Sequence, residues 1–529
     1  MDTRTHRVRG VRIAFALSIF AAPVAQAQLT DLTQTPNAEG AGIVKSLEQQ
    51  VGAGVGDLLT PGSSLYIIAR DPARSVRRGR QLFQRKFTDA QGFGPRARDG
   101  IGDIGAEANL GAGLVDSCAG CHGRPRGSAG FGGDVVTRPD SRDAPHLFGL
   151  GLQEMLADEI TMDLRAIRDR AISDARRSRN SITRTLSSKG INYGTIRAFS
   201  NGNVDSSGVR GVDRDLRVRP FFAHGGTISI REFVAGAFND EMGLQAVDPL
   251  LVQAAAGARI ITPSGMVLDG SKDTLQRPLA TTANDDPDAD GKFNEIPTAL
   301  VDHMEFYLFN YFKAATYRQT QTTQAGLQLM KQINCTSCHV QNLTINTDRR
   351  IADVETVYDS PRGIFNDLFA TASLLVVEQD DGSGHPSIKV PAQQSFVVRN
   401  FFADLKRHDL GPRFHERNFN GTMQTQFMTE PLWGVGSTAP YGHDGRSINL
   451  REVILRHGGE AQNSRNAFAS LSENSKLAIM EFLNSLVLFP PDDTASNLDP
   501  GDPNAAGFPQ RGHGSIRLPV VFNDPTELE

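Results

Sequence analysis

Two short motifs contain every cysteine of this 529-residue chain, and a histidine directly follows each pair. The first is CAGCH with Cys118, Cys121 and His122, and the second is CTSCH with Cys335, Cys338 and His339. Two thiols at this spacing can bond to both vinyl groups of one porphyrin, and the adjoining histidine can bind its iron from the proximal side. A thioredoxin-like redox pair and half of a zinc site are weaker interpretations of Cys-x-x-Cys alone. The motifs therefore predict two covalently bound haem c groups.

The N-terminus has the pattern of a secretory signal peptide. Four arginines precede an apolar run from Ile13 to Ala22, and Ala25-Gln26-Ala27 supplies a small-x-small cleavage site. We therefore expect residues 1–27 to be removed and the mature protein to be periplasmic, the side of the membrane on which bacteria attach haem c. The apolar run is too short to span a bilayer, and no later stretch approaches the necessary length.

The net charge of the mature chain indicates which kinds of macromolecule it could bind. Removing residues 1–27 takes four arginines and one aspartate from a chain of formal net charge −5, which leaves −8. This mild acidity argues against nucleic acid and suits a basic electron-transfer partner. The length allows two or three domains with their own cores.

An internal repeat pairs PFFAHGGTISIRE at 220–232 with PYGHDGRSINLRE at 440–452. Pro, Gly, Ile, Arg and Glu coincide in the two segments. The offset of 220 residues is close to the 217 that separate the haem motifs. The matching offsets indicate two copies of one haem domain.

The copies differ where the distal side of each iron is expected. The offset puts His457 opposite Ala237, so the second iron gains a histidine and the first meets a methyl group. Two axial histidines favour a saturated electron-transfer centre, whereas an iron with one histidine keeps a position open for peroxide or oxygen. Glu241, one helical turn beyond Ala237, is then a candidate proton shuttle. A capping or buried histidine beside Gly458 and a plain surface glutamate are the alternatives.

These features resemble the bacterial di-haem cytochrome c peroxidase superfamily, and within it the di-haem oxidoreductase (putative peroxidase) branch. Besides the haem motifs, the resemblance rests on APHLFGLGLQEM at 144–155, GAFNDEMG at 236–243, DLKRHDLG at 404–411, PLWGVG at 431–436 and YGHDGRSINLREVILRHGGEA at 441–461. These motifs extend over most of the mature chain.

The resemblance implies peroxide or oxygen chemistry at the N-terminal haem and electron relay at the C-terminal haem. The catalytic glutamate of the peroxidases precedes a methionine, which matches Glu241-Met242. Their distal ligand at the relay haem is a methionine, where His457 stands here. The peroxidases also carry a tryptophan between the haems in a Phe-Phe-Trp-Asp-Gly motif, whereas this chain has Ala223 and His224 after the two phenylalanines.

An acidic segment suggests a cation site. Asp286, Asp288 and Asp290 form the first half of a calcium loop, and the superfamily often holds calcium between its domains. Position 12 of the loop is Pro297 instead of the usual bidentate glutamate, and Glu295 is the candidate substitute. An acidic linker that merely joins the halves is the alternative.

The expected fold is mainly α, with two c-type cytochrome-like haem domains related by the repeat and with irregular insertions. The expected boundaries are 28–290 for the domain with the open, catalytic haem, 291–490 for the domain with the electron-transfer haem, and 491–529 for an irregular tail.

The function implied is that of a peroxidase-like oxidoreductase. A small cytochrome c or cupredoxin would reduce the second haem, electrons would cross to the first, and Glu241 would move the proton needed to break the O–O bond of the oxidant. Two alternatives stay open. One is an oxygenase that cleaves an apolar polymer, as rubber oxygenases do, with the insertion at 341–430 lining its channel. The other is a non-enzymatic electron carrier in which both irons are six-coordinate and His146 or His224 is the distal ligand of the first iron.

Overall fold

The structure is a computed structural model that describes residues 51–93, 115–123, 129–130, 134–135, 142–311, 315–316, 319–358, 368–418 and 421–488. The expected signal peptide and the expected C-terminal tail lie outside these residues. Helix makes up 37% and strand 15%, so the predominance of helix is confirmed. No helix of the described part is both long and apolar enough to cross a membrane.

One helical cluster, which we call the first cluster, surrounds the first haem motif. It contains α2 (Ser64–Arg70), α3 (Pro72–Gln84), α4 (Cys118–His122), α6 (Ile230–Met242), α7 (Pro249–Ala255) and α8 (Thr298–Asn310). Helix α8 is buried on almost every side, as expected of a central core helix. It crosses α3 closely at Gly79, where a Cβ would lie 2.4 Å from the His303 carbonyl oxygen. Although α8 follows the expected domain boundary at 290, it packs within the first cluster.

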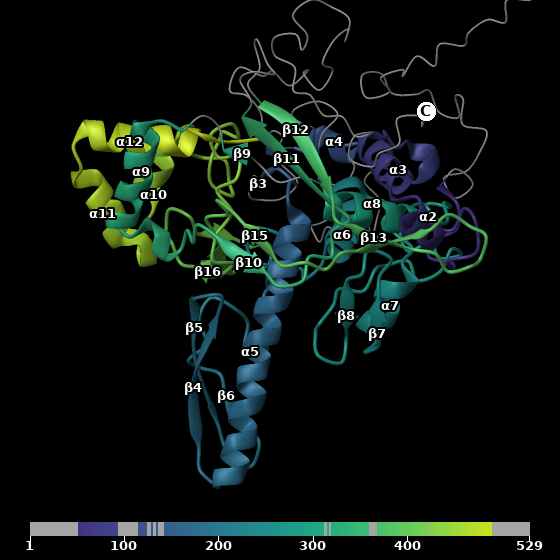
Figure 1. Ribbon diagram of the computed structural model, residues 1–529, viewed down its shortest axis with the longest axis horizontal. Helices are drawn as coiled ribbons and strands as arrows, with labels where there is room; N and C mark the ends of the chain where they lie inside the picture. Colours follow the sequence, from purple (N-terminus) through teal and green to yellow (C-terminus); the bar gives the residue numbers. More distant parts are fainter. Residues whose placement is uncertain are drawn as a thin grey trace, which may run out of the picture.

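The second cluster lies at the other end of the molecule (Figure 1). It contains α9 (Gln321–Gln332), α10 (Leu450–Arg456), α11 (Gln462–Ser470) and α12 (Glu473–Asn484). Thr320 and Thr323 cap the start of α9 reciprocally. Helices α9 and α12 cross at Gly326, where a Cβ would lie 2.0 Å from the Ala478 carbonyl oxygen. A separate small core that includes Phe468 and Phe482 joins these helices.

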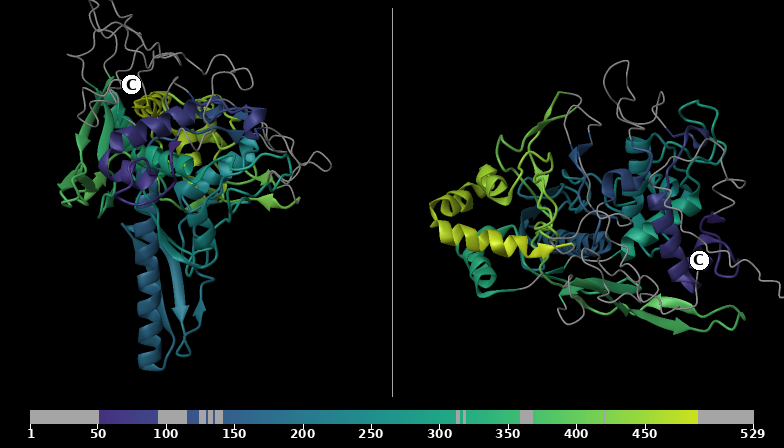
Figure 2. Two further views of the ribbon diagram at one scale, coloured as in Figure 1. Left: turned by 90° about the vertical axis from the view of Figure 1, so that its right-hand side faces the viewer. Right: turned by 90° about the horizontal axis from the view of Figure 1, so that it is seen from above.

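A long arm projects from the body, as both figures of the whole chain show (Figure 1, Figure 2). It consists of α5 (Leu150–Ser178) and the antiparallel strands β4 (Ile182–Ser188), β5 (Ile191–Ala198) and β6 (Val204–Asp205). The first turns of α5 are buried in the body, and the last are exposed. The N-terminal end of α5 therefore anchors the arm beside the haem motifs.

The remaining strands form antiparallel pairs. They are β2 (Asp134–Val135), β3 (Arg142–Asp143), β7 (Arg259–Ile261), β8 (Val267–Asp269), β9 (Ala315–Thr316), β10 (Leu343–Ile345), β11 (Ala352–Tyr358), β12 (Leu368–Leu374), β13 (Val376–Gln379), β14 (Ile388–Pro391), β15 (Phe396–Val398), β16 (Arg407–His408), β17 (Glu416–Arg417), β18 (Met423–Gln424), β19 (Phe427–Met428) and β20 (Leu486–Val487). The β13–β14 hairpin reaches the first cluster, where Arg70 pairs with Asp381. This part of the insertion thus packs against the first cluster.

Candidate functional site

The first Cys-x-x-Cys-His motif forms α4, and its one turn brings Cys118 and Cys121 to the same side of the helix. Ser117 caps this helix, because its Oγ accepts a hydrogen bond from the Gly120 amide at 3.1 Å. Residue 120 must be small, since a Cβ there would lie 2.1 Å from Val115 Cγ1. None of the four cysteines forms a disulfide, so all are available for thioether bonds.

The environment of the thiols fits haem attachment better than thiol redox chemistry. Burial raises the pKa of Cys118 and of Cys121 to about 12 and that of Cys335 to about 11. Thiol redox chemistry needs a thiolate and therefore a lowered pKa, which these thiols do not have. A thioether carries no charge, so apolar surroundings suit it. The cysteines therefore match covalent haem attachment.

Both motif histidines are oriented by a backbone carbonyl. His122 Nδ1 lies 2.7 Å from the Pro145 oxygen, and His339 Nδ1 lies 2.9 Å from the Phe402 oxygen. A carbonyl only accepts, so the proton is on Nδ1 and the lone pair is on Nε2, the arrangement in which an imidazole binds metal. Burial lowers the pKa of His122 to about 4 and also lowers that of His339, which keeps both rings neutral.

His457 is held in the same way at the second motif. It follows the last residue of α10, and its Nδ1 donates to the Val453 oxygen at 2.7 Å. Burial, and to a lesser extent the charge of His339, lowers its pKa to about 4. The two imidazoles therefore lie within electrostatic range of each other. The ring of Phe414 meets His457 edge-on, with centroids 5.3 Å apart. The structure thus brings both predicted ligands of the second iron together.

The two repeat segments form the same local structure before α6 and α10. Each contains an isolated β-bridge, Phe221 to Thr227 and Tyr441 to Ser447. The matching hydrogen bonds are Glu232 N to Ser229 Oγ (3.1 Å) and Ile228 N to Glu232 Oε2 (3.1 Å) in the first half, and Glu452 N to Asn449 Oδ1 (2.9 Å) and Ile448 N to Glu452 Oε2 (3.0 Å) in the second. The helices then differ, since α6 has 13 residues and α10 has seven. Ala237 accordingly lies inside α6, whereas His457 lies just beyond α10.

Glu241 lies close to the first motif. It stands in the last turn of α6, and its charge contributes, after burial, to the raised pKa of Cys121. Phe238, one turn earlier, packs edge-on against Phe87, with ring centroids 6.0 Å apart. Helix α6 ends at Gly243, which adopts a left-handed conformation (φ 67°). The predicted proton shuttle and the predicted thioether residue are therefore neighbours.

Neither histidine of the electron-carrier alternative is placed as an obvious ligand. His146 Nε2 donates to the Trp433 oxygen at 2.8 Å, and its Nδ1 accepts from the Phe148 amide at 3.2 Å. Both ring nitrogens are therefore engaged. His224 stacks on the ring of Phe222, with centroids 6.4 Å apart.

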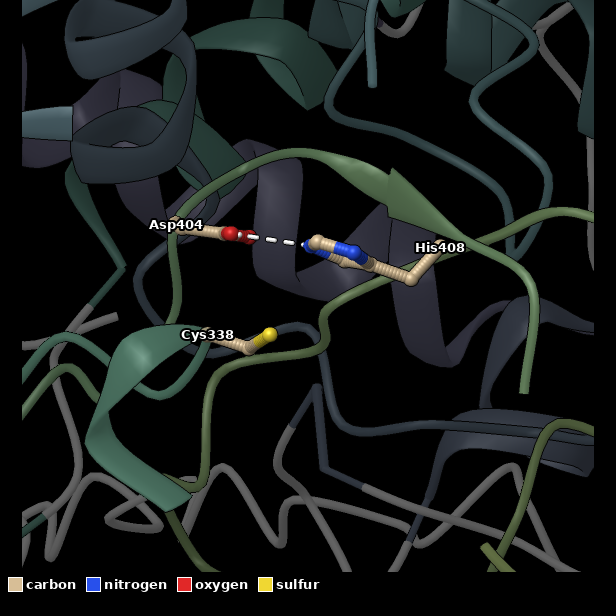
Figure 3. A group of neighbouring side chains, drawn as sticks. All are labelled: Cys338, Asp404 and His408. Carbon is tan, nitrogen blue, oxygen red and sulfur yellow. Dashed lines mark hydrogen bonds and ion pairs between the residues drawn. The ribbon is translucent and has the colours of Figure 1, made fainter. Parts of the chain in front are cut away.

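A buried charged cluster beside Cys338 was not predicted from the sequence. His408 Nε2 lies 2.9 Å from Asp404 Oδ2, and its Nδ1 lies 2.8 Å from Glu460 Oε2 (Figure 3 shows Asp404, His408 and Cys338). Burial alone would lower the pKa of His408, but hydrogen bonds to Asp404 and to the Cys338 sulfur outweigh it and raise this pKa to about 11. The imidazole is thus a cation between two carboxylates. With both nitrogens engaged, it is not free to bind a metal ion.

The acidic segment gathers three carboxylates. Asp286, Asp288 and Asp290 each place an oxygen within 4.8 Å of the others. Asp288 is only 5% exposed, and within the described residues neither of its oxygens accepts a hydrogen bond. Burial and the charge of Asp290 raise its pKa to about 6, and burial raises that of Glu295 to about 8. Carboxylate oxygens that accept no hydrogen bond have lone pairs available for a hard cation such as calcium.

Comparison with known proteins supports the motif-based recognition. Residues 341–486 match the model of the family described as di-haem oxidoreductase, putative peroxidase, which confirms the predicted family over this segment. No curated protein matches the sequence. Among solved structures, the chain is similar to hydrazine synthase of Kuenenia stuttgartiensis, at 14% identity and a TM-score of 0.21, over 36% of this chain and 55% of that one. It is also similar to a MauG-like protein associated with microbial copper homeostasis, at 14% identity and a TM-score of 0.27, over 78% and 88% of the two chains. The chain spans little more than half the length of the first of these.

Proposed function

We propose that this protein is a periplasmic di-haem oxidoreductase that reduces peroxide, or activates oxygen, at the first haem with electrons that enter at the second. One observation carries the proposal. The charge of His339 acts on His457 at the second motif, whereas the first motif has Glu241 and Ala237 on the equivalent helix. The match of residues 341–486 to the di-haem oxidoreductase family supports this assignment.

Each haem would be held by residues of its own half. The first would be bound by Cys118, Cys121 and His122, and the second by Cys335, Cys338, His339 and His457. The matching hydrogen bonds before α6 and α10 support an origin of the halves 28–290 and 291–490 from one haem domain. A bound haem with one axial histidine supplies the open iron position and the redox chemistry.

The residues of the chain orient the ligands and move protons. The carbonyls of Pro145 and Phe402 fix the proximal imidazoles, so that Nε2 of each is presented to its iron. Reduction of one peroxide to two waters consumes two electrons and two protons. Glu241 would donate a proton to the departing oxygen as the O–O bond breaks and would recover it from solvent. Ala237 leaves room for the oxidant.

The proposed location and electron donor are based on the expected signal peptide and on the net negative charge of the mature chain. Secretion through residues 1–27 would place the mature, acidic chain in the periplasm. A small cytochrome c or cupredoxin with a basic docking face would deliver electrons to the second haem. Calcium would be held by Asp286, Asp288 and Asp290, with Glu295 beside them, and would remove their mutual repulsion.

The test is peroxide-dependent oxidation of a reduced small cytochrome c by the purified protein with both haems. The proposal expects turnover that requires the donor, the protein and peroxide together. Absence of turnover with two low-spin haems would favour the electron-carrier alternative. Oxygen uptake on a polyisoprene emulsion, without peroxide turnover, would favour the polymer-cleaving alternative.

A further inference from the structure

A cavity of about 520 Å³ lies where the loop after β6 meets the insertion. One wall is formed by residues of the loop 206–214, and the other by Arg407 of β16 and by residues 423–426 around β18. The backbone joins the two walls, because the Arg407 amide donates to the Gly211 oxygen at 2.8 Å. A Cβ at Gly211 would lie 2.6 Å from Lys406 Cε, so the loop packs closely against the segment that carries Arg407. The cavity therefore has walls that are fixed to each other, and its volume is in the range of small-molecule sites.

The cavity has an excess of positive charge. Three arginines line it, Arg210, Arg214 and Arg407, against the single carboxylate of Asp213. Asp213 is already paired with Arg407 and with Arg219, which lies outside the lining. In a chain of formal net charge −5, this concentration of positive charge in a hollow indicates an anionic ligand.

Two of these arginines have hydrogen-bond donors left for a ligand. Arg214 makes no hydrogen bond or ion pair with any residue that the structure describes. Arg210 reaches only the carbonyl oxygens of Ser207 and Val209, each at the long distance of 3.4 Å. The hydroxyl-bearing side chain of Ser206 lines the same cavity. Strong donors are therefore gathered at a place where the described part of the chain supplies no matching acceptor.

We propose that this cavity binds a small organic anion, a molecule with a phosphate or carboxylate group held by Arg210 and Arg214. Each planar guanidinium can donate two parallel hydrogen bonds to such a group. The cavity is larger than a free phosphate ion requires, so the rest of the ligand would lie against residues 423–426. No haem ligand takes part, and the site is therefore independent of the proposed function.

The test is titration calorimetry of the purified protein with both haems against glucose 6-phosphate, succinate, inorganic phosphate and glucose. We expect one or both of the organic anions to bind, inorganic phosphate to bind more weakly, and neutral glucose not to bind. The affinity should fall as the salt concentration rises, because screening weakens the attraction between charges. Equal affinity for glucose 6-phosphate and inorganic phosphate would contradict an organic ligand. If neither organic anion bound, the site would be wrong.

Replacing the arginines tests where the anion binds. Arg210→Gln and Arg214→Gln should each weaken binding by about tenfold or more, since each removes a charge-assisted hydrogen bond. Arg214→Lys keeps the charge without the planar fork and should lose part of the affinity. Haem spectra that match those of the wild type check that each variant is folded.

The matched control is Arg170→Gln on α5. Arg170 is exposed, makes no ion pair within the described residues and does not line the cavity. Its replacement changes the net charge by the same amount and should leave the affinity unaltered. Equal losses in Arg170→Gln and Arg214→Gln would mean that the anion responds to overall charge alone, and this result would overturn the site.

Discussion

The carboxylate of Glu241 lies close enough to Cys121 that its charge helps to hold the pKa of that thiol at about 12, second to burial. A distal helix of the first half therefore presents an acid to its own haem motif. The equivalent helix of the second half ends early and presents His457. On this asymmetry between otherwise similar halves we base the proposal of chemistry at the first site and electron entry at the second.

Replacing Glu241 tests the proton-transfer role. We expect Glu241→Gln to lower kcat for peroxide by about 10²–10⁴-fold, because the amide cannot donate a proton to the departing oxygen. The measurement is steady-state turnover, with haem content and spectra as checks on folding. Glu473→Gln on the exposed side of α12 is the matched control and should keep full activity. Undiminished turnover in Glu241→Gln would show that another group supplies the proton.

Replacing His457 tests the distal ligand of the second haem. We expect His457→Ala to convert that haem from low-spin to high-spin, since α10 offers no other imidazole at this position. Electron paramagnetic resonance should show the change in the second haem with the first unaltered. The control is His385→Ala. His385 lies on the β13–β14 hairpin, where it contacts Tyr66 of α2, and its loss should change neither signal. A second haem that remains low-spin in His457→Ala would contradict this assignment.

The acidic segment should bind calcium more tightly as pH rises. Below about pH 8 a proton must leave Glu295, and below about pH 6 another must leave Asp288, before the cation can bind. Titration calorimetry at several pH values should therefore show the affinity rising from pH 5.5 to 8 and levelling above. Asp288→Asn should weaken binding, whereas Asp380→Asn on an exposed turn should not. An affinity independent of pH would count against these ligands.

The His408 cluster should stabilise the second half. His408→Leu leaves Asp404, which is 1% exposed, without its cation, and we expect the free energy of unfolding to fall by about 3 kcal/mol. The raised pKa of His408 sets the sign of the pH dependence. Its stabilisation is complete below pH 6.5, the ordinary value, and is lost as pH rises through the raised pKa.

Urea unfolding of wild type and variant across this pH range measures the effect. His415→Leu is the control, because its partner Asp409 is largely exposed and such pairs contribute less than about 1 kcal/mol. Equal losses in both variants would mean that burial of the Asp404 pair contributes nothing.

The parts of the site that are predictable from sequence are those encoded by local spacing. Cys121 and His122 stand three and four positions after Cys118 on one turn, and the repeat register gives His457 by counting. The acceptors Pro145 and Phe402 are backbone carbonyls, which carry no residue-specific signal and lie 23 and 63 positions from their histidines. Sequence patterns therefore predict the ligands but not what orients them.

Contacts across the fold were beyond sequence reasoning for a different reason. His146 and Trp433 are 287 residues apart, so only the folded chain brings the segment before α5 and the PLWGVG segment together. The insertion itself has many strands of two to four residues, too short for an alternating pattern to show. Of the charged partners of His408, Asp404 is only four residues away, whereas Glu460 is 52 residues away and meets it only in the folded chain.

Electron paramagnetic resonance of the resting protein with both haems tests the asymmetry most directly. The account predicts one high-spin ferric signal from the haem of Cys118 and Cys121, altered by peroxide, and one low-spin signal from the haem of Cys335 and Cys338. Two low-spin signals that peroxide leaves unchanged would contradict it.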